Sequence, residues 1–326
     1  MSPAHRAPLA SRVGALAVLF ATGSLVLLGS TVRVTESGMG CSSWPLCNGQ
    51  IGPIAQFHPL LEQSHRYLAA LVSIGVVVLY VAARRSGPLA FRRWTAVGTA
   101  TIVLQVPLGA LTVFAHNAPP TVAAHLLGGL VLLAATALAA AASFGLLDDR
   151  AWRLRTLDAV AIAMTALLLV SGTVVADGGA AGVCPSWPWC AAHPGAPWHL
   201  VTLQLVHRTM AGLTALVLLA AAGARLRGSA CPKSERRLCW GLVALLGAQV
   251  AAGALDTLLR APDALQDVHI GLAGALWCLA AIIFVGRAGA PITAPLPDDQ
   301  AALGAPGTES LRSGALTSSG SRTTAR

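Results

Sequence analysis

The sequence contains few charged residues. Aspartate, glutamate, lysine and arginine together make up 11% of the 326 residues, and the mean hydropathy is +0.67. Soluble domains carry about 25% charged residues. The chain therefore lacks the polar side chains that would cover a water-facing surface, which excludes a soluble globular protein and favours one embedded in a membrane.

Acidic residues are scarcer than basic ones, at 13 against 22, and the sequence pI is about 10. A basic protein can bind nucleic acid through a basic face interleaved with aromatic side chains. Here the lysines and arginines form short clusters between long apolar stretches instead. We therefore expect no nucleic-acid partner, and we interpret the basic clusters as the cytoplasmic side of a membrane protein.

Eight apolar stretches are about 20 residues long, which suits a hydrocarbon core of about 30 Å at 1.5 Å per residue. No small-residue cleavage site follows the first stretch before Arg33, so we expect that stretch to be a retained helix and not a signal peptide. The sequence thus predicts an all-α polytopic membrane protein. Its expected transmembrane helices are residues 13–32, 65–83, 94–115, 121–145, 157–176, 201–224, 238–258 and 267–286.

The segments between these helices alternate in charge. Three of them are basic. The four segments that alternate with these contain Arg33 and Arg260 as their only arginine or lysine residues. The positive-inside rule then places both termini in the cytoplasm of a bacterial inner membrane. Residues 1–12 and a disordered tail at 288–326 would be cytoplasmic. The basic segments are 84–93, 150–155 and 225–237, and the segments expected outside are 33–64, 116–120, 177–200 and 259–266.

The chain repeats itself with an offset of 142 to 144 residues. Cys41-Ser-Ser-Trp-Pro-Leu-Cys47 returns as Cys184-Pro-Ser-Trp-Pro-Trp-Cys190, His65-Arg66 returns as His207-Arg208, and His125 returns as His269. Internal repeats of this kind indicate a duplicated fold. We expect two four-helix bundles, residues 13–145 and 157–287, joined by a cytoplasmic linker at 146–156. Because each half has an even number of helices, a pseudo-twofold axis along the membrane normal should relate them.

Four of the nine histidines fall at the outer ends of the even-numbered helices: His65, His125, His207 and His269. A single such histidine could be hydrogen-bonded between helices or lie among the headgroups. Four of them, one per even-numbered helix and repeated between halves, favour a functional site. Two imidazoles facing each other across a four-helix bundle are a common way to hold heme iron, whereas zinc needs more ligands per site. The other histidines, which are His5, His58, His116, His193 and His199, show no matched spacing.

Arg66 and Arg208 directly follow two of these histidines. Each could pair with a heme propionate through charge-assisted hydrogen bonds. Each could equally extend to the outer headgroups.

The cysteines divide by location. Cys41 with Cys47, and Cys184 with Cys190, lie in segments expected to face an oxidising compartment, where each pair can close a small loop as a disulfide. Their spacing does not match a C-x-x-C redox motif, and both a structural and a redox-active disulfide fit it. We assign no role to the remaining cysteines, Cys231, Cys239 and Cys278.

These residues together resemble the heme A synthase family: Glu62-x-x-His65-Arg66, the second His-Arg at 207–208, the histidines at 125 and 269, and the paired outer cysteines. The resemblance covers residues 13 to about 287. It implies oxidation of a methyl group of heme O to a formyl group, which gives heme A for terminal oxidases. It also implies that one half holds a permanent heme b and the other receives heme O.

One sequence difference separates the halves. Glu62 lies three residues before His65 and shares its helix face, whereas the equivalent residue of the second half is Gln204. Oxidation of a methyl group needs proton removal or stabilisation of positive charge, and a carboxylate can supply either. We therefore expect heme O between His65 and His125, with Glu62 as the catalytic acid/base, and heme b between His207 and His269 as an electron relay. The alternative for Glu62 is an ordinary carboxylate at the membrane surface.

The expected partners are membrane lipid, the synthase that supplies heme O, and a quinone or other electron acceptor; the sequence leaves a homo-oligomer open. Two other function classes remain. A diheme b-type cytochrome linked to quinol would need the four histidines but not Glu62, and an outer-face thiol oxidoreductase would need only the cysteines. The difference between Glu62 and Gln204 favours an enzyme.

Overall fold

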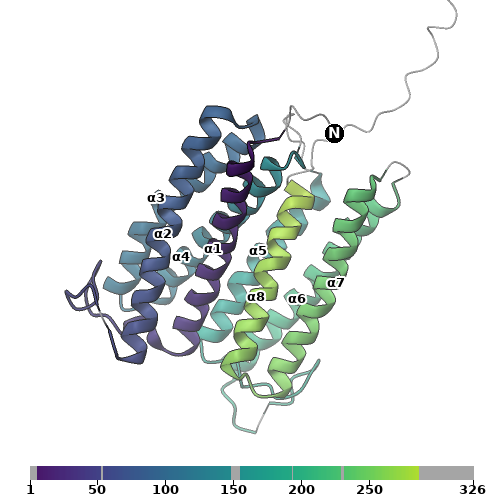
Figure 1. The fold of residues 1–326 in the computed structure, drawn as a ribbon. Helices are drawn as coiled ribbons and strands as arrows, with labels where there is room; N and C mark the ends of the chain where they lie inside the picture. Colours follow the sequence, from purple (N-terminus) through teal and green to yellow (C-terminus); the bar gives the residue numbers. More distant parts are fainter. Residues whose placement is uncertain (1–5, 53, 148–154, 193, 229–230, 286–326) are drawn as a thin grey trace, which may run out of the picture. The chain divides into compact units, whose positions relative to one another are not determined.

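The chain is described by a computed structural model that covers residues 6–52, 54–147, 155–192, 194–228 and 231–285. Within these residues it forms eight long helices, each long and apolar enough to cross a membrane, so the predicted all-α fold is confirmed (Figure 1). The helices are α1 (Leu9–Val34), α2 (Phe57–Ser86), α3 (Leu89–Phe114), α4 (Pro119–Ser143), α5 (Thr156–Asp177), α6 (Trp198–Leu226), α7 (Lys233–Leu258) and α8 (Asp263–Ala280).

Two short elements accompany these helices. A 3₁₀ turn, η2 (Ser37–Met39), follows α1, and a π-helical turn, η3 (Ala281–Val285), continues α8. The predicted disordered tail at 288–326, His5, His193 and residues 148–154 of the predicted linker lie outside the described residues.

Most helices begin at a proline. A proline is the residue just before α1, α3, α6, α7 and α8, and α4 begins with Pro119. Proline suits this position because it has no N–H to leave unpaired at a helix start. The largest boundary difference is at α2, which begins at Phe57, eight residues before the predicted 65. Its first two turns mix apolar residues with His58, Glu62, Gln63 and Ser64, so hydropathy alone does not reveal them.

The outward faces of the helices are apolar. On α2, Leu71, Ile74 and Val78 are 65%, 62% and 61% exposed, whereas Val72 and Val76 on the other side are buried. In water this pattern would be unfavourable, since exposed apolar area costs free energy. It suits a helix that faces lipid on one side and other helices on the other.

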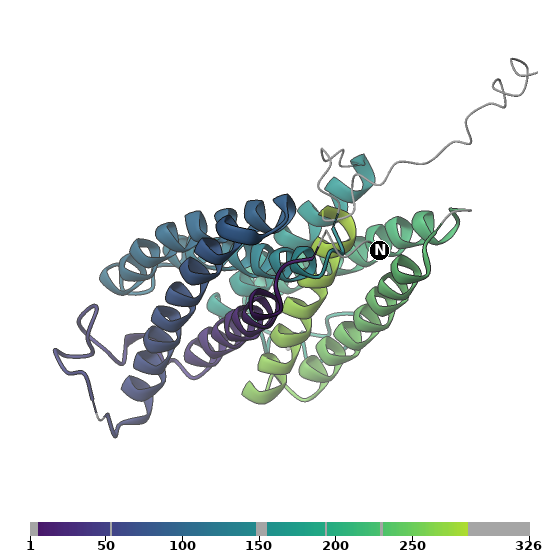
Figure 2. The ribbon, with the colours of Figure 1, turned by 45° about the horizontal axis from the view of Figure 1, so that its top comes forward.

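Consecutive helices are neighbours within each half. In the first half α4 also returns to contact α1, and in the second α8 contacts α5. The halves meet where α1 contacts α8 and where α4 contacts α5 and α8; Figures 1 and 2 both show α1 beside α8. The Trp277 indole N–H donates to the Leu130 carbonyl across this boundary at 2.8 Å. The division at 146–156 and the pseudo-twofold axis stay predictions.

The two long connections, residues 35–56 and 178–197, lie at the same end of the helices, which we call the loop end (Figure 1). Side chains are packed more tightly toward the opposite end of the helices. In α4, most residues from Leu130 to Ser143 are buried and none before Leu130 is, and in α8 the first buried residue is Leu276. The parts of α4 and α8 near the loop end, which carry His125 and His269, are therefore only half-buried.

A buried ion pair lies at the opposite end of the second half. Arg225 of α6 contacts Asp158 of α5 at 2.6 Å and Glu235 of α7 at 3.3 Å, and its guanidinium lies over the Phe284 ring. Charges buried this far need such partners, because an isolated charge at this depth is costly. The pair joins three helices of the second half.

Candidate functional site

The four predicted histidines come together as two pairs. His65 of α2 and His125 of α4 lie close enough to interact electrostatically, and so do His207 of α6 and His269 of α8. Each pair belongs to one half of the sequence repeat. The helices thus bring together histidines that are 60 and 62 residues apart in the chain (125 − 65 and 269 − 207).

In the first half the imidazoles have spare coordinating capacity. The Nδ1 atoms of His65 and His125 are buried and have no hydrogen-bond partner among the described residues. Gln105 of α3 donates its side-chain N–H to the His125 carbonyl at 2.9 Å. This contact ties α3 to the helix turn that presents His125.

In the second half the rings have more polar contacts. The Oγ of Ser171 lies 2.8 Å from His207 Nδ1, and Gln249 Nε2 lies 3.2 Å from His269 Nε2, while His269 Nδ1 is buried without a partner among the described residues. Hydrogen bonds of this kind orient an imidazole that binds a metal.

Sequence reasoning missed these supporting residues. Gln105 and Gln249 are separated by 144 residues, which is also the offset between His125 and His269. That shared offset could have revealed them. Ser171 could not be found in this way, because the residue 143 positions earlier is Leu28.

The arrangement fits a heme in each half. A heme supplies four nitrogens of its own and needs only axial ligands from the protein, which two imidazoles provide. No group of three or more histidine, cysteine or acidic side chains placed to hold a bare metal ion occurs among the described residues. The unpartnered Nδ1 atoms and the looser packing around His125 and His269 both agree with a flat, apolar group between the helices.

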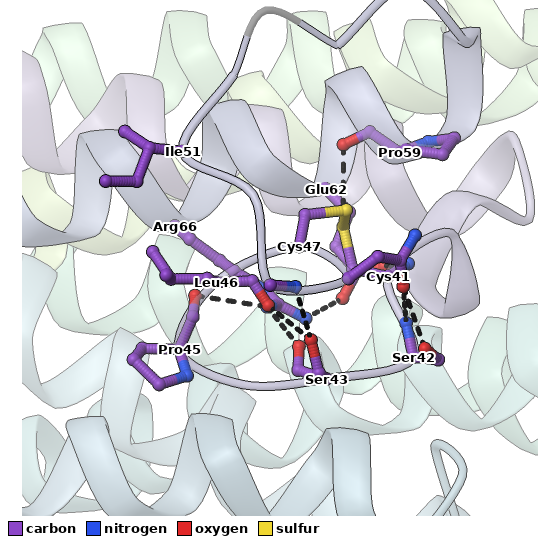
Figure 3. Close-up of a disulfide and its surroundings, with 12 residues drawn as sticks. Cys41, Ser42, Ser43, Pro45, Leu46, Cys47, Ile51, Pro59, Glu62 and Arg66 are labelled. Carbon is purple, nitrogen blue, oxygen red and sulfur yellow. Dashed lines mark hydrogen bonds and ion pairs between the residues drawn. A yellow bond between two sulfur atoms is a disulfide. The ribbon is translucent and has the colours of Figure 1, made fainter.

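Glu62 is buried in the first turns of α2. Its two carboxylate oxygens accept hydrogen bonds from Arg66 Nη2 at 2.5 Å and from the Cys41 backbone N–H at 2.8 Å (Figure 3). A carboxylate can accept about four hydrogen bonds. Glu62 therefore keeps lone pairs that can take a proton or face a positive charge.

Gln204 occupies the equivalent position in α6 but makes the opposite kind of contact. Its side-chain N–H donates to the carbonyls of Ala180 and Ala181, at 2.9 and 3.0 Å. An amide can donate here because it carries N–H groups, which a carboxylate lacks. The two halves thus hold their loops with different chemistry at one shared position.

Arg66 and Arg208 both reach into the disulfide loops. Arg66 donates to the Ser43 and Pro45 carbonyls at 2.6 and 3.2 Å, as Figure 3 shows. Arg208 donates to the equivalent carbonyls of Ser186 and Pro188, at 2.8 and 3.3 Å. Each guanidinium fixes its loop over the start of its own helix, and its contact with a propionate stays a prediction.

Both predicted disulfides are present, Cys41–Cys47 and Cys184–Cys190. Since the Cys41 N–H binds Glu62, the first disulfide loop directly contacts the candidate acid/base. The cysteines without an assigned role, Cys231, Cys239 and Cys278, are not disulfide-bonded. His58 Nδ1 lies 2.8 Å from the Ser37 Oγ, and His58 belongs to neither histidine pair.

Comparison with known proteins adds a family. The sequence profile of the COX15-CtaA family, described as cytochrome oxidase assembly protein, matches residues 12–59 and 55–281. A protein named heme A synthase from Symbiobacterium thermophilum is 32% identical over 271 residues, which cover 77% of this chain and 87% of that protein. Another so named, from Geobacillus kaustophilus, is 32% identical over 220 residues, covering 64% of this chain and 68% of that protein.

A longer relative carries a different name. A Thermus thermophilus protein named protoheme IX farnesyltransferase is 34% identical over 277 residues, which cover 78% of this chain but only 45% of that protein. This chain thus spans about half the length of that relative. More than half of the relative lies outside the shared region.

Proposed function

Because the chain belongs to the cytochrome oxidase assembly protein family, we propose that it is a membrane oxidoreductase that converts heme O into heme A. The reaction oxidises a methyl carbon of heme O to a formyl carbon. Electrons and protons leave that carbon, and an oxygen atom is added. Two relatives named heme A synthase support this reaction.

The observation that carries the proposal is the unequal pair of sites. Both halves hold two histidines close together, but only the first has a carboxylate one helical turn before a histidine, where the second has an amide. A protein that only passed electrons between two hemes would have no use for this difference. We assign the first half to substrate and the second to a resident cofactor.

In the first half, His65 and His125 would hold heme O as substrate, and Glu62 would act beside it. The Glu62 carboxylate is held in place by Arg66 and by the Cys41 N–H. These contacts restrict the rotamers that the side chain can adopt. From there it can accept a proton from the substrate or stabilise positive charge on it. Arg66 balances the negative charge of Glu62 while the site is at rest.

In the second half, His207 and His269 would hold heme b, which would relay electrons to an external acceptor such as a quinone. Ser171 and Gln249 would orient the two imidazoles through the contacts described above. Gln204 leaves this half without an ionisable group at the position of Glu62, which suits a site that transfers electrons only.

Heme O must be delivered to the first half. The longer Thermus relative is named protoheme IX farnesyltransferase although the shared region covers 45% of it. We propose that a farnesyltransferase acting on protoheme supplies the substrate of this chain. The two activities then act in sequence on one porphyrin.

The direct test is to express the chain with and without a protoheme farnesyltransferase, extract the hemes, and separate them chromatographically. We expect heme A only when the farnesyltransferase is present, and heme b bound to the purified protein in both cases. Heme b alone under both conditions would contradict the synthase and leave a diheme cytochrome. Heme A formed without the farnesyltransferase would contradict the proposed supply.

We also propose that the loop end faces outward and that both termini are cytoplasmic. The charge asymmetry of the connections and the two disulfides at the loop end support this orientation. In intact spheroplasts treated with a reductant, a membrane-impermeant thiol reagent should label Cys41 and Cys47. Labelling only after the membrane is broken would reverse the orientation.

A further inference from the structure

Each of the four paired histidines lies over a glycine of the preceding helix. The imidazole of His65 lies over Gly29 of α1, and that of His125 over Gly109 of α3. The second half repeats the arrangement with His207 over Gly172 of α5 and His269 over Gly253 of α7. The glycines follow the sequence repeat, at offsets of 143 (172 − 29) and 144 (253 − 109).

The contact leaves little room for a side chain. A methyl group at Gly253 would lie 2.8 Å from His269 Cε1, and the corresponding distances at Gly29, Gly109 and Gly172 are 3.0, 3.2 and 3.3 Å. Two carbon atoms prefer a separation of about 3.5–4.0 Å. An alanine at Gly253 would therefore push the ring aside, and at the other three positions the ring would have to move by a few tenths of an ångström.

Small residues also occur where two helix backbones approach closely, but that does not explain these four glycines. At each of them, the nearest atoms that an added methyl group would meet belong to the histidine ring. No backbone atom of the facing helix is among them. The glycine therefore makes space for the imidazole and not for the helix.

The four glycines also stand at the same distance from the ends of their helices. Each glycine stands five residues before the last residue of its helix: Gly29 before Val34, Gly109 before Phe114, Gly172 before Asp177 and Gly253 before Leu258. At 1.5 Å per residue this is about 7.5 Å from each helix end. The same distance from the helix end is expected at all four positions if each glycine makes space for one of the paired histidines.

We propose that Gly29, Gly109, Gly172 and Gly253 are positioning residues, which we call glycine seats, that fix the position and plane of the four heme-binding imidazoles. The inference rests on the proposed heme function. Each ring is held on its Cε1 side by its seat, which limits how the ring can lie against the preceding helix. Filling a seat changes ligand geometry without removing the ligand.

The test compares two glycines of one helix. Gly247 of α7 has nothing within 4 Å of an added methyl group, so Gly247→Ala is the matched control for Gly253→Ala. Alanine favours helix more than glycine does, so neither change should unfold α7. We expect Gly253→Ala to weaken heme b binding about tenfold and to alter its ferric low-spin electron paramagnetic resonance signal, with Gly247→Ala unchanged in both.

The same comparison applies to substrate in the first half. Gly29→Ala should weaken heme O binding to the purified protein, while Gly23→Ala, which also meets nothing within 4 Å, should not. His269→Ala separates the possible failures. If it loses heme b while Gly253→Ala keeps normal binding and an unaltered signal, the seats are refuted and the heme site stands. If His269→Ala retains heme b, the ligand assignment itself is wrong.

Discussion

Glu62→Gln is expected to stop heme A formation while leaving both hemes bound. Proton transfer by a positioned side chain contributes about 10²–10⁴-fold to a rate, so product formation should fall by about that factor. The substitution gives α2 the amide that α6 already has at Gln204. The measurement is the ratio of heme A to heme O extracted from the purified variant.

The second half shows why the variant should keep its fold. There an amide at this position supports a buried loop contact, and Arg208 holds the disulfide loop through backbone carbonyls alone. Glu36→Gln is a suitable control, because it removes an exposed carboxylate at the same end of the bundle. Normal product from Glu62→Gln would exclude an acid/base role. Loss of bound heme would show that Glu62 is structural.

Removing a ligand from the second half is expected to remove the resident heme. In His207→Ala or His269→Ala, the heme b content of the purified protein should fall by at least about tenfold, because iron coordination depends on these imidazoles. The absorption spectrum of the reduced protein reports this directly. Heme A formation should fall with it, since the electron relay is lost.

The matching changes in the first half should act differently. His65→Ala and His125→Ala should keep heme b and lose heme O binding. His58→Ala is the control, since His58 contacts Ser37 and belongs to neither pair. If the first-half variants lose heme b and the second-half variants keep it, the assignment of the two halves is reversed.

The helices could be predicted from sequence because each is a long apolar run, a signal carried by neighbouring residues. The start of α2 could not, because Phe57 and Leu60 are exposed and only Glu62 and Gln63 are buried there, where Glu62 binds the Cys41 N–H of the preceding loop. The same reason hid the contacts of Arg66. A hydrogen bond to the Ser43 carbonyl depends on how a 23-residue segment folds back (66 − 43), and residue types do not encode this locally.

The histidine pairs were predictable because they are both rare at membrane depth and repeated. The glycine seats carry the same repeat, but glycine is common in this chain, with 33 residues. Only the structure shows which of them face an imidazole. Ser171 has no repeat partner, so its contact with His207 needed the three-dimensional arrangement.

The common depth of the glycine seats has an electrical consequence. The glycines that contact the two histidine pairs all lie five residues from the ends of α1, α3, α5 and α7. With hemes bound at the two pairs as proposed, we expect electron transfer between them to run parallel to the membrane plane. A charge that crosses the membrane gains or loses about 2.3 kcal/mol per 100 mV, but one that moves at constant depth crosses none of that voltage. We therefore expect the proposed electron step between the halves to be independent of the membrane potential.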